Sequence, residues 1–222
     1  MWKRGVLALQ GRPPDAASAR AVILAFERGA CEDWKAACLL GAIGHPDGYA
    51  TALAILRSGD STRASVYAGP ALTKMWGAAA FADLAAILGD PAFDRRIHEG
   101  AAYGLAELAD PRAVDVLMAA VDAKRVRMST AGSVMSERPL APALLLGWLR
   151  GGRSARRTVA MWALFYRSAS DTERAIPAEL REALHAEIDR GGSPFTDAQE
   201  AMLRERLARP IAPLPVARVI KR

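Results

Sequence analysis

The sequence predicts an all-α protein whose short helical hairpins stack in a row to form an α-α superhelix, or solenoid. Apolar residues recur at the spacing of an α-helix, and helix-ending residues recur about thirty positions apart. A basic residue lies at the start of the helix that follows each of these helix ends. Hairpins of that length bury their apolar faces only against their neighbours. About six hairpins and a C-terminal cap are therefore expected to share one elongated core.

The hairpin pattern is clearest in residues 95–121, RRIHEGAAYGLAELADPRAVDVLMAAV. Each of its two expected helices has one apolar face, which includes Ala101 in the first helix and Leu117 in the second. The turn between them contains Asp110 and Pro111. An aspartate side chain accepts from free N–H groups at a helix start, and proline at the first helical position has no N–H to leave unpaired.

Glycines at the ends of successive second helices mark the period. The six expected ends are Gly29, Gly59, Gly89, Val121, Gly151 with Gly152, and Gly191 with Gly192. Glycine just past a helix end adopts the left-handed conformation without strain, so these positions predict regular helix stops. Acidic residues then precede four of the following helices, as the helix dipole favours: Asp33, Asp60, Asp94 and Asp122.

The stretch DRRIHEGAAYGLAELADPRAVDVLMAAV resembles the HEAT-like repeat found in the bilin lyases of phycobiliproteins and in many bacterial proteins. A second copy, CEDWKAACLLGAIGHPDGYATALAIL, is similar but has His45 where Asp110 stands. The resemblance covers residues 30 to 190 and implies an α-solenoid of HEAT-like hairpins. Because this repeat serves many unrelated tasks, it implies no single activity.

The opening and middle units follow in order. Residues 2–10 are expected to form the first helix of an incomplete opening unit, and Asp15 starts its second helix. The second unit spans residues 31–59. In the third unit, Gly69 and Pro70 are expected to interrupt and kink the first helix.

The later units depart from the pattern. The fifth unit, 125–152, lacks the Asp-Pro turn, and Pro139 and Pro142 begin its second helix. A sixth unit begins at Ala155, an inserted stretch separates it from a helix at 177–190, and a capping helix starts at residues 196–199. We therefore expect one domain over residues 1–208, followed by a proline-rich basic tail, 209–222.

Composition restricts the class of protein. Of 222 residues, 51% are hydrophobic, which suits a packed interior. The uncharged run 139–149 is about half the length that crosses a bilayer, and the N-terminal apolar stretch is too short for a signal peptide, so a cytoplasmic protein without a membrane partner is expected. Cys31 and Cys38 lack the spacing of a zinc or redox motif and are expected to be reduced, partly buried thiols.

A group of basic residues stands out among the candidate sites: Lys124, Arg125, Arg127, Arg153, Arg156 and Arg157. In a stacked array, the turns before the fifth and sixth units fall on one edge, which would gather these side chains into a patch. The patch could bind an anionic partner, such as nucleic-acid phosphate or an acidic protein segment. Alternatively, these residues form a ladder between repeats by bonding to aspartates and helix ends.

The sequence contains no motif for catalysis, a cofactor or a metal. The histidines lack metal-ligand spacing, and no phosphate-binding loop or nucleophile elbow is present. His98 and Glu99 are expected on an exposed polar face. The larger aromatic residues are expected mostly in the core: Trp34, Tyr49, Trp76, Tyr103, Trp148 and Trp162.

Three functions are compatible with this reading. The favoured one is a non-catalytic scaffold in which the second helices of the hairpins line a concave surface that binds another protein or a peptide, which would be acidic if the basic patch takes part. The second is a nucleic-acid binder resembling the HEAT-like alkylpurine DNA glycosylases, although no stretch matches their catalytic motifs. The third, a bilin lyase-like chromophore binder, is implied only by the repeat family.

Overall fold

The computed structural model describes residues 13–108, 110–137, 142–151, 154–169, 176–191 and 193–208, and all regular structure among them is helical. The α-helices are α2 (Ala16–Glu27), α3 (Asp33–Ile43), α4 (Tyr49–Ser58), α5 (Thr62–Trp76), α6 (Phe81–Gly89), α7 (Arg95–Ala106), α8 (Arg112–Asp122), α9 (Met128–Glu137), α10 (Pro142–Gly151), α11 (Ser154–Ala169), α12 (Ala178–Asp189) and α13 (Asp197–Ala208). Two short 3₁₀ helices, η1 (Pro46–Gly48) and η2 (Gly77–Ala80), precede α4 and α6. The all-α prediction is confirmed.

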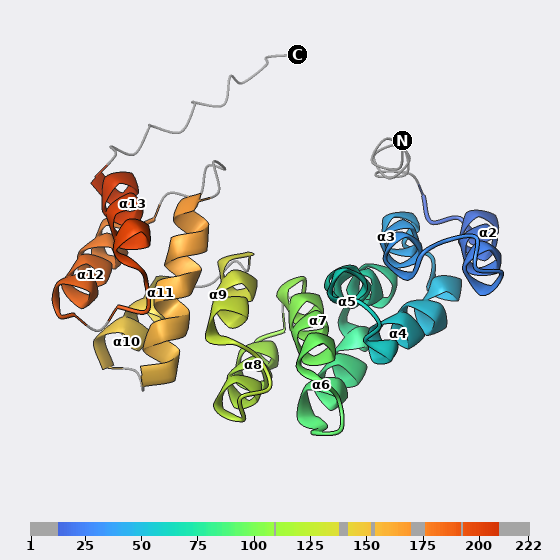
Figure 1. Ribbon diagram of the computed structural model, residues 1–222, viewed down its shortest axis with the longest axis horizontal. Coiled ribbons are helices and arrows are strands. Elements are labelled where there is room, and N and C mark those ends of the chain that lie inside the picture. Colours follow the sequence, from blue (N-terminus) through green and yellow to red (C-terminus); the bar gives the residue numbers. More distant parts are fainter. Residues whose placement is uncertain are drawn as a thin grey trace, which may run out of the picture.

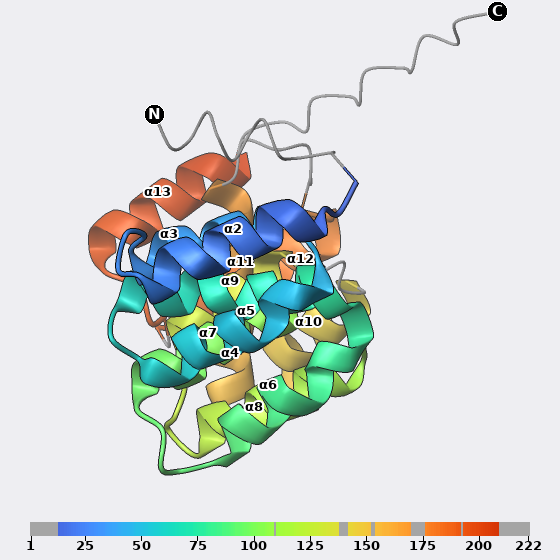
Figure 2. The same ribbon diagram turned by 90° about the vertical axis from the view of Figure 1, so that its right-hand side faces the viewer.

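The helices form two layers that follow an arc (Figure 1). Helices α3, α5, α7, α9 and α11 line its inner side, and α2, α4, α6, α8, α10 and α12 lie on its outer side; the view from the end shows the successive helices one behind another (Figure 2). The expectation that the second helix of each hairpin lines the inner surface is therefore wrong. The first helices of the hairpins occupy that side instead.

Contacts between successive inner helices recur at a nearly constant separation along the chain. Ser61 donates to Asp33 across 28 residues, and the Thr73 hydroxyl donates to the Gly104 carbonyl across 31 residues at 2.9 Å. Between α5 and α7, Gly69 lies against Gly100 and Thr73 bonds to Gly104, and both pairs are 31 residues apart, so these two helices run in the same direction. The thirty-residue period of the sequence is thus also the period of the packing.

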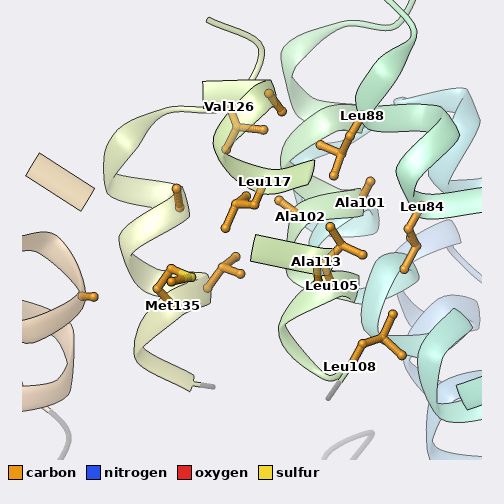
Figure 3. Close-up of a cluster of buried hydrophobic side chains, with 14 of the residues drawn as sticks. Leu84, Leu88, Ala101, Ala102, Leu105, Leu108, Ala113, Leu117, Val126 and Met135 are labelled. Carbon is orange, nitrogen blue, oxygen red and sulfur yellow. The ribbon is translucent and has the colours of Figure 1, made fainter. Parts of the chain in front are cut away.

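A continuous apolar core lies between the two layers. Figure 3 shows its middle, where Leu84 and Leu88 of α6 meet Leu105 of α7, and Leu117 of α8 lies near Met135 of α9. All five side chains are at most 1% exposed. Most of the core expected from the apolar stripes is confirmed, because each helix lies against at least two neighbours.

Small residues bring the inner helices into close contact. A Cβ atom on Gly69 of α5 would lie 1.9 Å from the carbonyl oxygen of Gly100 on α7, and one on Gly104 would lie 2.7 Å from the carbonyl oxygen of Gly69. The same feature recurs between α9 and α11, where a Cβ on Gly132 would lie 2.2 Å from the Cβ of Trp162. Glycine at these positions allows one backbone to lie directly on the next.

Several helix ends follow the sequence prediction and two differ from it. Gly29, Gly59 and Gly191 have positive φ values of 68°, 63° and 77° after their helices, as expected. Gly89 instead is the last residue of α6, and Asp90, which follows it, has an extended backbone. After α8 the left-handed position is taken by Lys124, with a φ of 61°. There the Arg125 N–H donates to the Ala120 carbonyl, the bond that closes a Schellman-type helix end.

The predicted interruption at Pro70 does not occur. Helix α5 continues through it from Thr62 to Trp76, and the chain turns only at Gly77, where φ is 54°. Residues 62–89, which include α5 and α6, are long and apolar enough to cross a membrane by length and composition alone. Buried core helices of other proteins share that property. In this fold they form two α-helices that pack in different layers (Figure 1).

Candidate functional site

The inner side of the arc exposes polar and aromatic side chains. On α5, Arg63, Tyr67 and Lys74 are exposed, and their spacing of four and seven residues places them on one face. Helices α3, α7 and α4 pack against the other sides of α5. The exposed face of α5 therefore points into the inner side of the arc.

A polar cluster extends this surface from α7 to α9. Two short hydrogen bonds join Arg127 to Glu99: Arg127 Nε and Nη2 each donate to a carboxylate oxygen of Glu99 at 2.6 Å. This carboxylate raises the pKa of Arg127. Nearby, the Tyr103 hydroxyl hydrogen-bonds the Ser133 side chain, and burial of Tyr103 raises its pKa. The cluster ties consecutive inner helices together and leaves the Arg127 side chain 59% exposed.

The expectation that His98 and Glu99 lie on an exposed polar face is wrong. His98 is 2% exposed and Glu99 is 5% exposed. Both are buried because each meets a partner outside its own helix turn. Glu99 meets Arg127, and His98 Nε2 lies 2.9 Å from the Asp90 carbonyl oxygen in the loop before α7. The helical spacing of α7 could not reveal these partners, because Asp90 and Arg127 both lie outside that helix.

The residues of the predicted basic patch have different positions. Lys124 takes the left-handed position after α8, and Arg125 Nη1 donates to the Leu88 and Gly89 carbonyls at 3.0 and 2.8 Å, so Arg125 caps α6. Arg127 binds Glu99, as described above. At the start of α11, Arg157 Nε lies 3.6 Å from Glu187 on α12.

The remaining patch residues are Arg156 and Arg153. The Arg156 guanidinium carbon lies 5.9 Å from the centre of the Trp148 ring, and Arg153 lies outside the described residues. Arg125, Arg127 and Arg157 thus contact groups of neighbouring helices, which is the ladder arrangement. Their contacts leave the anionic-partner interpretation of the patch as a proposal.

The two layers differ in charge. The whole chain has 30 basic and 24 acidic residues, and the residues that the structure describes include 20 basic and 22 acidic ones. The inner-layer helices contain eight basic and three acidic residues: Lys35, Arg63, Lys74, Arg95, Arg96, Arg156, Arg157 and Arg167, with Asp33, Glu99 and Glu137. The outer-layer helices contain five basic and eight acidic residues: Arg20, Arg57, Arg112, Arg150 and Arg181, with Glu27, Asp83, Asp115, Asp122, Glu179, Glu182, Glu187 and Asp189. Positive charge is therefore concentrated in the inner layer.

Aromatic residues contribute to both the core and the surface. At the first described inner helix, the Arg63 guanidinium carbon lies 4.8 Å from the centre of the Trp34 ring, and the rings of Trp34 and Tyr67 are 6.1 Å apart. Tyr49 is buried as expected, whereas Trp76 is 50% exposed and lies against it, with 4.3 Å between ring centres. Trp76 departs from the core prediction because α5 ends there at the turn.

An open cavity of about 660 Å³ lies at the turns that follow α5 and α7. Its lining includes Thr73, Glu107, Leu108, Asp110 and Arg112. Arg112 is held in place by Asp110, whose carboxylate accepts from its Nη2 at 2.6 Å, and by the Phe81 ring, 4.3 Å away. Arg112 is the only basic residue among the described residues that line the cavity, and these two contacts already engage its guanidinium group. The lining therefore offers no free cation for a small anion.

No group of three or more His, Cys, Asp and Glu side chains that could hold a metal ion gathers in the described parts of the chain. Cys31 and Cys38 are free thiols, and burial raises the pKa of each. Comparison of the chain with protein-family models, curated proteins and solved structures finds no match. The inner surface of the arc is accordingly the candidate functional site on its geometry alone.

Proposed function

We propose that the protein is a non-catalytic binding scaffold, a solenoid of HEAT-like hairpins whose concave inner surface binds another protein or a peptide. The observation that carries this proposal is the inner layer itself. Its helices α3, α5 and α7 run in the same direction at a repeat of about thirty residues, so equivalent positions line up across them. A surface of this kind suits an elongated partner that contacts several repeats.

Two tyrosines of the inner layer, exposed Tyr67 and partly buried Tyr103, support the same function. Tyr67 and Tyr103 combine a large apolar ring with a hydroxyl, the type of side chain that is enriched in protein interfaces. Arginine is also enriched there, and Arg63 lies on this face. The Glu99–Arg127 ion pair and the Tyr103–Ser133 hydrogen bond hold α7 and α9 in one arrangement, so a partner would meet a preorganised surface.

A photo-crosslinking experiment tests the proposal. Benzoylphenylalanine is introduced at Tyr67 or Tyr103 on the inner face, and in matched proteins at Ala86 of α6 or Ala119 of α8, both exposed on the outer layer. The scaffold function predicts a discrete crosslinked product from the inner positions in the native host and none from the outer ones. Equal products from both sets, or products from the outer set alone, would rule it out.

Two alternative functions have separate readouts. Nucleic-acid binding predicts a complex with random duplex that weakens steeply as salt rises. Tetrapyrrole binding predicts a change in the visible spectrum when a bilin is added.

A further inference from the structure

We propose that the partner of the inner surface is an acidic polypeptide segment, bound in an extended form across α3, α5, α7 and α9. This inference rests on the proposed function and adds the chemistry of the partner. It is carried by the segregation of charge between the two layers. Helices α3, α5, α7 and α9 contain five basic and three acidic residues, whereas the outer helices contain five basic and eight acidic ones, so the inner side is the more favourable one for an anionic chain.

The cations that face the inner side are spaced for contacts with separate side chains. Arg63 lies near the start of α5 over the Trp34 ring, and Lys74 lies near its other end. Lys74 has no hydrogen-bond or ion-pair partner among the described residues, so its ammonium group is available. Arg96 at the start of α7 is 51% exposed and holds the Asp94 carboxylate at 2.9 Å. These cations alternate with aromatic rings instead of forming an unbroken row.

This alternation favours a peptide over a nucleic-acid backbone. Binding of duplex DNA requires several basic groups that can each neutralise a phosphate. On this surface Arg96 and Arg127 already have carboxylate partners, Asp94 and Glu99. A polypeptide with carboxylates separated by apolar side chains needs fewer cations, and its apolar residues can contact Tyr67 and Tyr103.

The test uses a fluorescein-labelled peptide about 15 residues long, which spans roughly 50 Å when extended. It alternates Glu or Asp with Leu, and two control peptides carry Gln or Lys in place of the acidic residues. Fluorescence anisotropy is measured with the full chain, with the inner variant R63E/K74E and with the outer variant R28E/R150E. The two variants change net charge equally, and Arg28 and Arg150 are exposed on α2 and α10 sides of the array.

We expect the acidic peptide to bind the unmodified chain and the outer variant alike, and to bind the inner variant about tenfold more weakly, as two exposed charge pairs become repulsive. Comparable binding of the Gln or Lys peptide would overturn the inference, as would equal loss in both variants or no binding of the acidic peptide. A random duplex that binds more tightly than the acidic peptide would replace it with nucleic-acid recognition. Inner-face crosslinks to a partner without acidic segments would leave the scaffold function intact and refute only this inference.

Discussion

Substitution of Gly69 by alanine tests the close packing of the inner layer most directly. The added Cβ would lie 1.9 Å from the Gly100 carbonyl oxygen and 3.0 Å from the Gly104 nitrogen, both backbone atoms. To reach an ordinary contact of about 3.4 Å, α5 and α7 have to separate by about 1.5 Å. That movement also stretches the hydrogen bond from Thr73 to the Gly104 carbonyl.

The expected magnitude follows from three contributions. Overpacking costs about 3 kcal/mol, at the upper end of the usual range, because the colliding atoms are backbone. Weakening the Thr73 hydrogen bond costs about 1 kcal/mol, and the better helix propensity of alanine returns about 1 kcal/mol. The net loss of about 3 kcal/mol in the free energy of unfolding should lower Tm by about 6 to 12 °C in a chain of this size.

Thermal and urea denaturation followed by far-UV circular dichroism measure this loss. Gly147→Ala is the matched control, because Gly147 is also inside a helix but a Cβ there would meet no atom within 4 Å. The control should be more stable than the unmodified chain by up to about 1 kcal/mol. If Gly69→Ala proves as stable as the control, the backbone contact between α5 and α7 does not exist in solution.

Four further predictions concern single positions. Lys124→Gly should raise the free energy of unfolding by about 1 kcal/mol in urea denaturation, because glycine adopts a positive φ without strain; a loss of stability would contradict the left-handed helix end. Glu99→Gln should lower that free energy by about 1 kcal/mol, since Arg127 loses a charged acceptor but stays partly solvated, whereas Glu107→Gln on the exposed part of the same segment should change nothing measurable. Burial and the hydrogen bond to Asp83 hold the pKa of Tyr49 far above its ordinary value, so stability should fall as pH rises above about 10, and Tyr49→Phe should remove that part of the fall in denaturation measured against pH. Burial raises the pKa of Cys38, so iodoacetamide should label it slowly in the native protein and faster in urea; equal rates would show that the thiol is not protected.

The sequence was sufficient to predict the helices because their determinants are local. Apolar spacing located most of the core, and Asp110 accepts from the Arg112 N–H at 2.9 Å as its place before a helix suggested. Helix α12 matches its expected range within one residue at each end. Local signals misled where tertiary contacts decide the outcome: α5 continues through Pro70 because neighbouring helices pack on three of its sides.

The inner surface was harder to predict. The spacing of Arg63, Tyr67 and Lys74 is visible in the sequence, but only the layer arrangement shows that these side chains share an exposed face with α7 and α9. Arg125 and Arg127 show a second reason why the sequence alone does not predict a surface. They lie two residues apart, yet one reaches the end of α6 and the other the middle of α7, so a cluster in the sequence is divided between two contacts in space.

The glycine contacts of the inner layer also explain why the array bends. Glycine and alanine let α5 approach α7 down to backbone contact, whereas bulky groups such as Phe81 and Arg112 separate α6 from α8 on the opposite side. Successive helices therefore lie closer together in the inner layer than in the outer layer, and this difference bends the array. Side-chain volume at a few positions sets the radius of curvature, so enlarging inner residues or trimming outer ones should flatten the row and change the length of chain it can accommodate.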